Sequence, residues 1–285
     1  MPGKIGAMDV RLDVRRPFHG AALLEFLRLR VVPGIEAAGD DWYARSFRLP
    51  HGYAVARLEF GAADNVRCEL RLTDPLDLSA AVERLRWLVD ADCDPVAVDR
   101  ALGADPVMAP LVRRRPGLRV PGHVDGDEVA VRAVLGQQIS VRAAAGAAGT
   151  LVQRLGMPIE SGIEGITHLF PDAAAIAAVD PEGLRMPRSR GRALVGLCAA
   201  LAAGDIALDR TAERGAVRSA LVALPGIGPW TADYIALRAL GDPDVFLPTD
   251  LGVKHALPVG ADPDDWRPWR SYALLHLWTT LSEQD

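Results

Sequence analysis

The stretch LPGIGPWTADY, residues 224–234, decides how the last third of this sequence folds. Before it, apolar residues at 217, 220, 221 and 224 recur at the i, i+3, i+4, i+7 spacing of an amphipathic helix. After it, residues 230–240 have the pattern of a second helix. The two glycines allow a tight, partly left-handed turn, and a proline suits the first position of the second helix. The sequence therefore predicts a helical hairpin. Its backbone N–H groups could bind a phosphate, and an ordinary turn is the alternative.

Three further stretches accompany this hairpin in a fixed order along the chain. They are LGQQIS (135–140), DVFLPTD (244–250) and WRPWRSYALLHLW (266–278). Together with the hairpin they resemble the AlkA-type 3-methyladenine DNA glycosylase II family, within the helix-hairpin-helix DNA glycosylase superfamily. Weaker similarity from about Tyr43 onward extends the resemblance over nearly the whole chain. The resemblance implies an enzyme that hydrolyses the N-glycosidic bond of alkylated bases, such as 3-methyladenine and 7-methylguanine, flipped out of duplex DNA. Such an enzyme initiates base excision repair.

The order of predicted elements indicates an α+β fold. Three strands are predicted at 42–49, 53–60 and 66–72, and helices at 21–31 and 78–89. Beyond Asp94 helical patterns dominate to the end of the chain. We therefore expect an N-terminal α+β domain with an antiparallel sheet at 1–110. A helical region at 111–285 would follow, with the helix-hairpin-helix at about 216–240. The resemblance implies that this region forms two mostly α-helical domains with an active-site cleft between them.

Asp250 is the candidate catalytic residue. From the residues alone it is a helix N-cap, because Leu251, Val253 and Leu257 follow it with helical spacing. The resemblance adds a catalytic role. A carboxylate beside C1′ stabilises the oxocarbenium-like transition state formed when an N-glycosidic bond breaks. A helix N-terminus favours a negative charge, so the two roles are compatible.

Trp230, Tyr234 and Trp278 match pocket aromatics of the family. Without that match, Trp230 and Tyr234 form an i, i+4 pair of the kind that usually packs in a core. With it, they become walls for a flipped base, since electron-rich rings attract a cationic N-alkylated purine. Bifunctional members of the superfamily carry a Schiff-base lysine where this chain has Trp230. A monofunctional glycosylase without lyase activity is therefore expected.

The resemblance also assigns DNA contacts. Gln137 and Gln138 would belong to a wedge loop that enters the minor groove. From the residues alone this segment is a polar loop between two predicted helices, with Ser140 as a candidate N-cap of the second. Gly226, Ile227 and Gly228 would bind phosphate through the hairpin backbone, and their carbonyls could hold a monovalent cation. Lys254, four positions after Asp250, could pair with that carboxylate or approach a phosphate. Two residues depart from the family pattern, which has Leu at Gln138 and Tyr at Leu251. These departures leave the range of excised bases open.

Composition limits the remaining choices. The net charge of −5 is unusual for a nucleic-acid binder, so affinity would depend on arginine clusters at 113–119 and 185–192, whose alternative is a solvated surface. The three scattered cysteines (68, 93 and 198) argue against a disulfide framework, a zinc site and the iron–sulfur cluster of some relatives, so no metal or cofactor is expected. The apolar runs are too short to cross a membrane, and residues 1–7 lack the apolar stretch of a signal peptide.

We therefore expect a cytoplasmic, nucleoid-associated monomer whose partner is duplex DNA. Some relatives are fused to an alkyl-transfer regulatory domain, and the sequence leaves open whether this chain is part of such a fusion. Two other functions stay open: a non-catalytic helix-hairpin-helix DNA-binding protein with Asp250 merely a cap, and a glycosylase for deaminated or oxidised bases.

Overall fold

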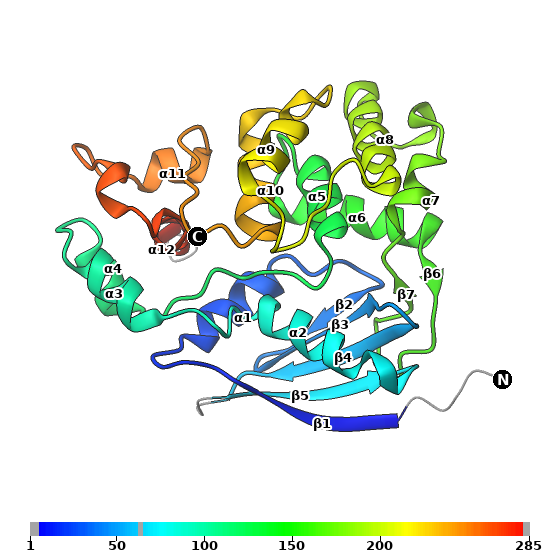
Figure 1. Ribbon diagram of the computed structural model, residues 1–285, viewed down its shortest axis with the longest axis horizontal. Helices are drawn as coiled ribbons and strands as arrows, with labels where there is room; N and C mark the ends of the chain where they lie inside the picture. Colours follow the sequence, from blue (N-terminus) through cyan, green and yellow to red (C-terminus); the bar gives the residue numbers. More distant parts are fainter. Residues whose placement is uncertain (1–5, 62–64, 282–285) are drawn as a thin grey trace.

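The N-terminal third of the protein is a five-stranded antiparallel sheet in the order β1–β5–β4–β3–β2. The computed structural model describes residues 6–61 and 65–281. Residues 1–5, part of the N-terminal stretch for which no signal peptide is expected, lie outside the described residues. Figure 1 shows the sheet as the lower layer, with most helices above it. The strands are β1 (Gly6–Asp13), β2 (Glu36–Ala38), β3 (Trp42–Arg48), β4 (Tyr53–Glu59) and β5 (Asn65–Leu72).

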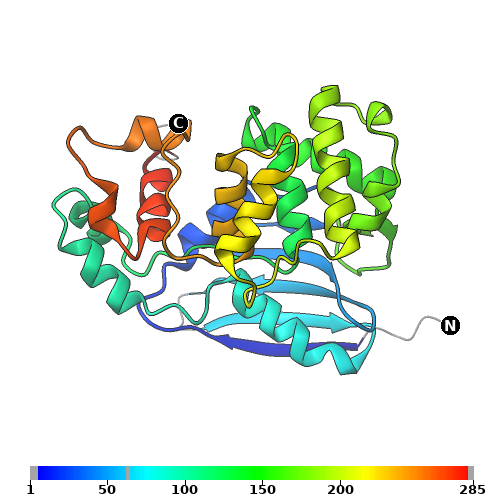
Figure 2. The same cartoon turned by 45° about the horizontal axis from the view of Figure 1, so that its top comes forward.

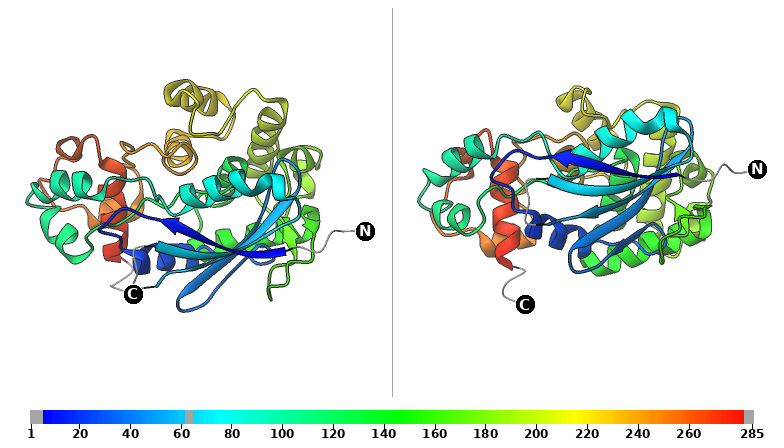
Figure 3. Two further views of the ribbon diagram at one scale, coloured as in Figure 1. Left: turned by 60° about the horizontal axis from the view of Figure 1, so that its bottom comes forward. Right: turned by 90° about the horizontal axis from the view of Figure 1, so that it is seen from below.

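Two helices pack on the sheet, α1 (Gly20–Arg28) and α2 (Leu78–Leu88). Leu23 of α1 and Leu85 of α2 share one hydrophobic core with Leu58 and Leu70 of the central strands. The opposite side of the strands contributes Ala44 and Val55 to a smaller core with residues 159–166. In the views from below, the strands lie in front of the helical region (Figure 3). The expected α+β organisation is thus confirmed.

Two strands of the five-stranded sheet, β1 and β2, were not predicted from the sequence, and neither was the short pair β6 and β7. In β1, Met8, Val10 and Leu12 alternate with charged residues, and only Leu12 is fully buried. Such a half-exposed edge strand carries a weak hydrophobic signal. β2 has only three residues, too short for an alternating pattern to be recognised.

The rest of the described chain is largely helical, in two groups that Figure 2 separates clearly. In one group α5 contacts both α8 and α10, and in the other α12 contacts both α4 and α11. A single hydrophobic core runs through both groups. The helices are α3 (Pro95–Gly103), α4 (Ala109–Arg114), α5 (Gly126–Leu135), α6 (Val141–Leu155), α7 (Ala173–Ala177), α8 (Arg188–Ala203), α9 (Arg214–Ala223), α10 (Pro229–Ala239), α11 (Leu251–Ala256) and α12 (Arg270–Leu281). Short elements complete the fold: η1 (Pro75–Asp77), η2 (Pro181–Gly183), η3 (Pro263–Trp266), β6 (Met157–Pro158) and β7 (His168–Leu169).

The predicted hairpin is present as α9 and α10. The predicted boundary near residue 110 falls inside α4 (Ala109–Arg114), which packs beside α3, and both helices lie on the side of α11 and α12. Within the described residues, no helix combines the length and apolar character needed to span a bilayer.

Candidate active site

Residues of both helical groups and of the N-terminal domain line one cavity of about 1340 Å³. Its wall includes Asp250, Trp230, Tyr234 and Trp278, so the structure brings together the predicted catalytic residue and all three predicted aromatics. The aromatics come from α10 and α12, while Asp250 directly precedes α11. Residues 137, 138, 226 and 228 also line the cavity, whereas Ile227 and Lys254 do not.

The three aromatic rings form a continuous surface. The rings of Trp230 and Tyr234 stack with centroids 5.4 Å apart and planes inclined by 11°. The ring of Trp278 is tilted by 48° to Tyr234, with centroids 6.4 Å apart. All three side chains are half-buried, so part of each ring faces the cavity. A base can lie against this surface, although not between the two rings already stacked on each other.

Asp250 is held by three N–H donors. The indole Nε1 of Trp230 donates to Oδ2 over 3.2 Å, and that of Trp278 donates to Oδ1 over 3.0 Å. The backbone N–H of Val253 also donates to Oδ1 over 3.0 Å, which is the predicted N-cap of α11. Each carboxylate oxygen therefore accepts from a different tryptophan, and the carboxylate lies against the aromatic surface.

Gly252 makes room for this arrangement, and the sequence analysis did not single it out. A Cβ on Gly252 would lie 3.1 Å from Oδ1 of Asp250, 3.4 Å from the Trp278 ring and 2.9 Å from Leu281. A glycine in the first turn of α11 was the available signal. It costs helix stability and so requires a local reason.

The phenol of Tyr234 lies among arginines that the sequence analysis also missed. Nη1 of Arg238 donates to its Oη over 3.1 Å, and the guanidinium of Arg30 interacts with it as well. Burial by itself raises the pKa of Tyr234, but the charges of Arg238 and Arg30 outweigh it and lower the pKa below its ordinary value. For the cationic Arg30, burial acts in the opposite direction and lowers the pKa to about 10. This part of the cavity wall is therefore positively charged.

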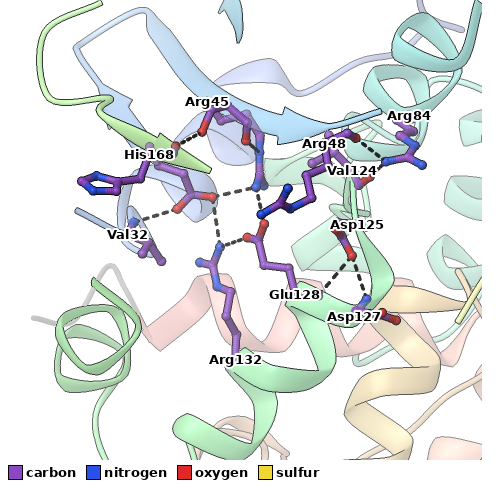
Figure 4. Close-up of polar contacts among 12 residues, drawn as sticks. Val32, Arg45, Arg48, Arg84, Val124, Asp125, Asp127, Glu128, Arg132 and His168 are labelled. Carbon is purple, nitrogen blue, oxygen red and sulfur yellow. Dashed lines mark hydrogen bonds and ion pairs between the residues drawn. The ribbon is translucent and has the colours of Figure 1, made fainter. Parts of the chain in front are cut away.

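A buried ionic network fastens the N-terminal domain to the helix that leads into the wedge loop (Figure 4). Arg45 of β3 bonds to Glu36 and Glu128, at 3.2 and 2.5 Å. Arg132 bonds to the same two carboxylates at 3.0 and 2.9 Å, and also to the carbonyl of Arg30 at 2.6 Å. Burial raises the pKa of Glu36, but the charges of Arg132 and Arg45 lower it overall. Desolvation of the buried charges offsets much of their attraction, so the network by itself is weak evidence for stability. The i, i+4 spacing of Glu128 and Arg132 was its only sequence signal.

The hairpin glycines have different roles. Gly226 has φ +86°, and a Cβ there would lie 2.6 Å from Cβ of Ala193 on α8, so both backbone and packing require glycine. Gly228 has an ordinary φ of −85° and open space where a Cβ would stand. It precedes Pro229 at the start of α10, which lacks a side-chain cap. The left-handed turn therefore depends on Gly226 alone, while Gly228 leaves an uncapped helix N-terminus uncovered. The Ile227 side chain is buried, so only its backbone can reach a ligand.

The predicted wedge loop connects α5 to α6. Oγ of Ser140 accepts from the Ala143 N–H over 3.2 Å, which confirms the predicted cap. Gln138 is exposed and has φ +58°, an uncommon conformation for a residue other than glycine. Gln137 instead braces the loop: its Nε2 donates to the Gly226 carbonyl over 3.0 Å and to Oγ1 of Thr231 over 3.1 Å.

The remaining predicted contacts separate into exposed and buried side chains. Lys254 is exposed, and among the described residues it forms no ion pair with Asp250, whose oxygens are taken by the N–H donors. Arg185, Arg188 and Arg192 are exposed, whereas Arg190 donates to the Gln137 carbonyl. The expectation that Arg119 belongs to a basic surface cluster is wrong. Arg119 is 1% exposed and donates to backbone carbonyls of Asp90, Cys93, Arg15 and Pro17, so it cannot belong to a basic surface.

Within the described residues, no three His, Cys, Asp or Glu side chains are grouped as a metal site. A monovalent cation would need backbone carbonyls of the hairpin. Two of these, Leu224 and Gly226, already accept hydrogen bonds from the Ile227 N–H and from Gln137. A cation at the hairpin stays a prediction.

Comparison with known proteins identifies the family of this chain. A family profile, "AlkA N-terminal domain", matches residues 9–125. The DNA-3-methyladenine glycosylase 2 of Escherichia coli K12 is 36% identical over 287 residues, which cover 94% of this chain and 96% of that protein. This chain belongs to the AlkA-type 3-methyladenine DNA glycosylase family.

Two other relatives extend the comparison. A probable bifunctional transcriptional activator/DNA repair enzyme AlkA of Mycobacterium tuberculosis is 44% identical over 97% of this chain. The chain spans only 58% of that relative's length. The solved 3-methyladenine DNA-glycosylase of Archaeoglobus fulgidus superposes with a TM-score of 0.79 at 20% identity, over 94% of this chain and 97% of that one, which supports the fold. Because the chain belongs to this glycosylase family, the cavity that contains Asp250 is its candidate active site.

Proposed function

We propose that this chain is a monofunctional DNA glycosylase that hydrolyses the N-glycosidic bond of alkylated purines extruded from duplex DNA. Such a reaction initiates base excision repair. Membership of the AlkA-type family supports the reaction class. The observation that carries the proposal is the double hydrogen bond from Trp230 and Trp278 to the two oxygens of Asp250.

That arrangement suits the charge that the reaction develops. A purine alkylated at N3 or N7 is cationic and can rest on the electron-rich surface of Trp230, Tyr234 and Trp278. The sugar carbon C1′ would then lie towards Asp250. As the bond from C1′ to the base nitrogen breaks, its electron pair leaves with the base and positive charge grows on the sugar. A fixed carboxylate beside C1′ stabilises this charge.

Water completes the reaction. The oxygen of the water bonds to C1′ and one proton of that water passes to the solvent, which leaves an abasic deoxyribose and a neutral base. Because the alkylated base departs as a neutral molecule, the reaction does not need a strong general acid. Trp230 occupies the place of the Schiff-base lysine, so we expect the DNA backbone to stay intact.

DNA contacts follow from the same geometry. The N-terminus of α10 beside Gly228 would bind one phosphate, and the loop at Gln138 would enter the gap left by the extruded nucleotide. The carboxylate and the aromatic surface come from one chain, so a monomer suffices. A duplex substrate would place the protein in the cytoplasm, on nucleoid DNA.

A base-release assay on methylated duplex DNA tests the proposal. The expected products are free 3-methyladenine and 7-methylguanine, with strand cleavage only after alkali is added. Duplexes with hypoxanthine or oxidised guanine test the alternative substrates. Binding to methylated duplex without release of any base would favour the non-catalytic alternative. A covalent adduct trapped by borohydride would contradict the monofunctional assignment.

A further inference from the structure

Exposed apolar side chains gather at the edge of the active-site cavity. Ten large hydrophobic residues are notably exposed in the described part of the chain, and four of them line this one cavity. These four, here called the apolar rim, are Leu29 (53% exposed), Ile139 (38%), Val141 (45%) and Leu251 (71%). They come from three places in the chain: the end of α1, the segment from the wedge loop into the start of α6, and the start of α11.

Folding does not explain the most exposed member of the rim. Leu251 gains little from burial in the free protein, and any good helix former could occupy the first position of α11. Single exposed leucines are common and need no explanation. Leu251, however, directly follows the carboxylate that would act on C1′, and it shares the cavity with Ile139, the neighbour of Gln138.

Cations lie beside the rim. Arg142, also exposed, lines the cavity next to Val141, and exposed Lys254 follows Leu251 by three positions. Apolar groups bordered by cations match the surface of DNA with an extruded nucleotide. There, sugar rings and unstacked base planes are apolar and the adjoining phosphates are negative.

We propose that the apolar rim is a DNA-contacting surface: Leu251 packs on the deoxyribose of the extruded nucleotide, and Ile139 fills part of the gap in the base stack. The inference rests on the proposed glycosylase function. It assigns to two residues the apolar contact that the exposed amide of Gln138 cannot provide alone. Burial of Leu251 and Ile139 would stabilise the extruded state, whereas Gln138 would hydrogen-bond the orphaned base.

The test compares Leu251→Ala and Ile139→Ala with Leu76→Ala and Val96→Ala, whose side chains are 74% and 49% exposed and lie outside the cavity. Alanine at residue 251 keeps α11 and its cap, because alanine is the best helix former. The readouts are single-turnover release of hypoxanthine from a duplex, fluorescence of a 2-aminopurine beside the lesion, and the salt dependence of duplex binding. Leu251→Met serves as the rescue.

We expect each rim variant to lose about tenfold in release rate, equivalent to about 1.4 kcal/mol, and to lower the 2-aminopurine signal. The salt slope should stay that of the wild type, because no phosphate contact is removed. Leu251→Met should recover most of the activity. Rim variants that behave like Leu76→Ala, or a changed salt slope, would overturn the assignment. If the wild type releases no base, the proposed function fails, yet the fluorescence comparison still tests the rim.

Discussion

The indole N–H of Trp278 on α12 donates to Oδ1 of Asp250 over 3.0 Å, so a pocket wall also orients the candidate catalytic carboxylate. Trp278→Phe keeps the ring and removes this bond. We expect a loss of about tenfold in single-turnover base release, since hydrogen bonds to charged groups contribute about 1.5–3 kcal/mol. Trp278→Ala removes the wall as well and should lose more. Equal rates for Trp278→Phe and the wild type would show that the bond does not position Asp250.

Asp250→Asn separates catalysis from capping. Asparagine caps helices as well as aspartate does, so α11 should stay folded. The variant lacks the charge opposite the developing oxocarbenium ion, and we expect base release to fall by roughly a thousandfold or more. Affinity for damaged duplex should change little. Near wild-type single-turnover release would refute the catalytic assignment.

Substitutions of the two hairpin glycines should affect different properties, stability for Gly226 and duplex affinity for Gly228. Gly226→Ala forces a side chain into a left-handed backbone and against Ala193, so we expect a loss of stability of about 1 kcal/mol or more. Gly228→Ala meets open space and should fold normally, yet its methyl group would cover the amides proposed to bind phosphate. Thermal melts and duplex affinity measure the two effects. Weakened binding by Gly228→Ala should be alike for damaged and undamaged DNA; a loss confined to one lesion would argue against phosphate binding.

Alanine substitutions of the two wedge-loop glutamines should also differ in how they affect release of the two bases. Gln137→Ala removes the hydrogen bonds to Gly226 and Thr231 that brace the loop, so release of hypoxanthine and of 3-methyladenine should fall by similar factors. Gln138→Ala acts only on the gap and should slow hypoxanthine release more, because this base is more stably paired. Gln138→Leu should preserve or raise activity. Single-turnover release rates for hypoxanthine and 3-methyladenine test these expectations. Equal losses of rate on both lesions from Gln138→Ala would contradict the wedge role.

The stability of the protein should depend on pH through Asp90. Burial raises the pKa of this carboxyl to about 6, although Arg119 and the Tyr272 hydroxyl oppose the shift. A raised carboxyl pKa means that the folded state holds the proton more tightly than the unfolded state. The stabilising contribution is therefore full below pH 4 and is lost as the pH rises through about 6.

Asp90→Asn isolates this effect. His123 and His276, whose pKa values burial lowers to about 4 and about 3, change stability with the opposite sign and are present in both proteins. From pH 4.5 to 7.5, the stability of the wild type relative to Asp90→Asn should fall by about 2 kcal/mol. Urea denaturation at several pH values measures this difference. A constant difference would mean that Asp90 does not titrate in this range.

Features set by near neighbours in the chain could be predicted from the sequence. The hairpin between α9 and α10, the cap at Ser140 and the cap at Asp250 depend on residues within about four positions of each other, and the structure contains all three. Helical periodicity likewise located α2 and α10. The β1 strand was missed because only one of its side chains is fully buried.

Features set by packing between distant segments needed the tertiary structure. Arg30 approaches Tyr234 from about 200 positions earlier in the chain, and Gln137 reaches a carbonyl 89 positions away. Arg119 resembled its neighbours in a basic cluster, yet the fold surrounds it with carbonyl oxygens and removes it from the surface. A periodic pattern specifies which face of a helix is apolar, but not which helix meets it or at what angle. Local sequence patterns therefore specified the hairpin, the helix caps, three of the five strands of the N-terminal sheet and the candidate residues, while packing of the sheet and helices brought those side chains into one cavity.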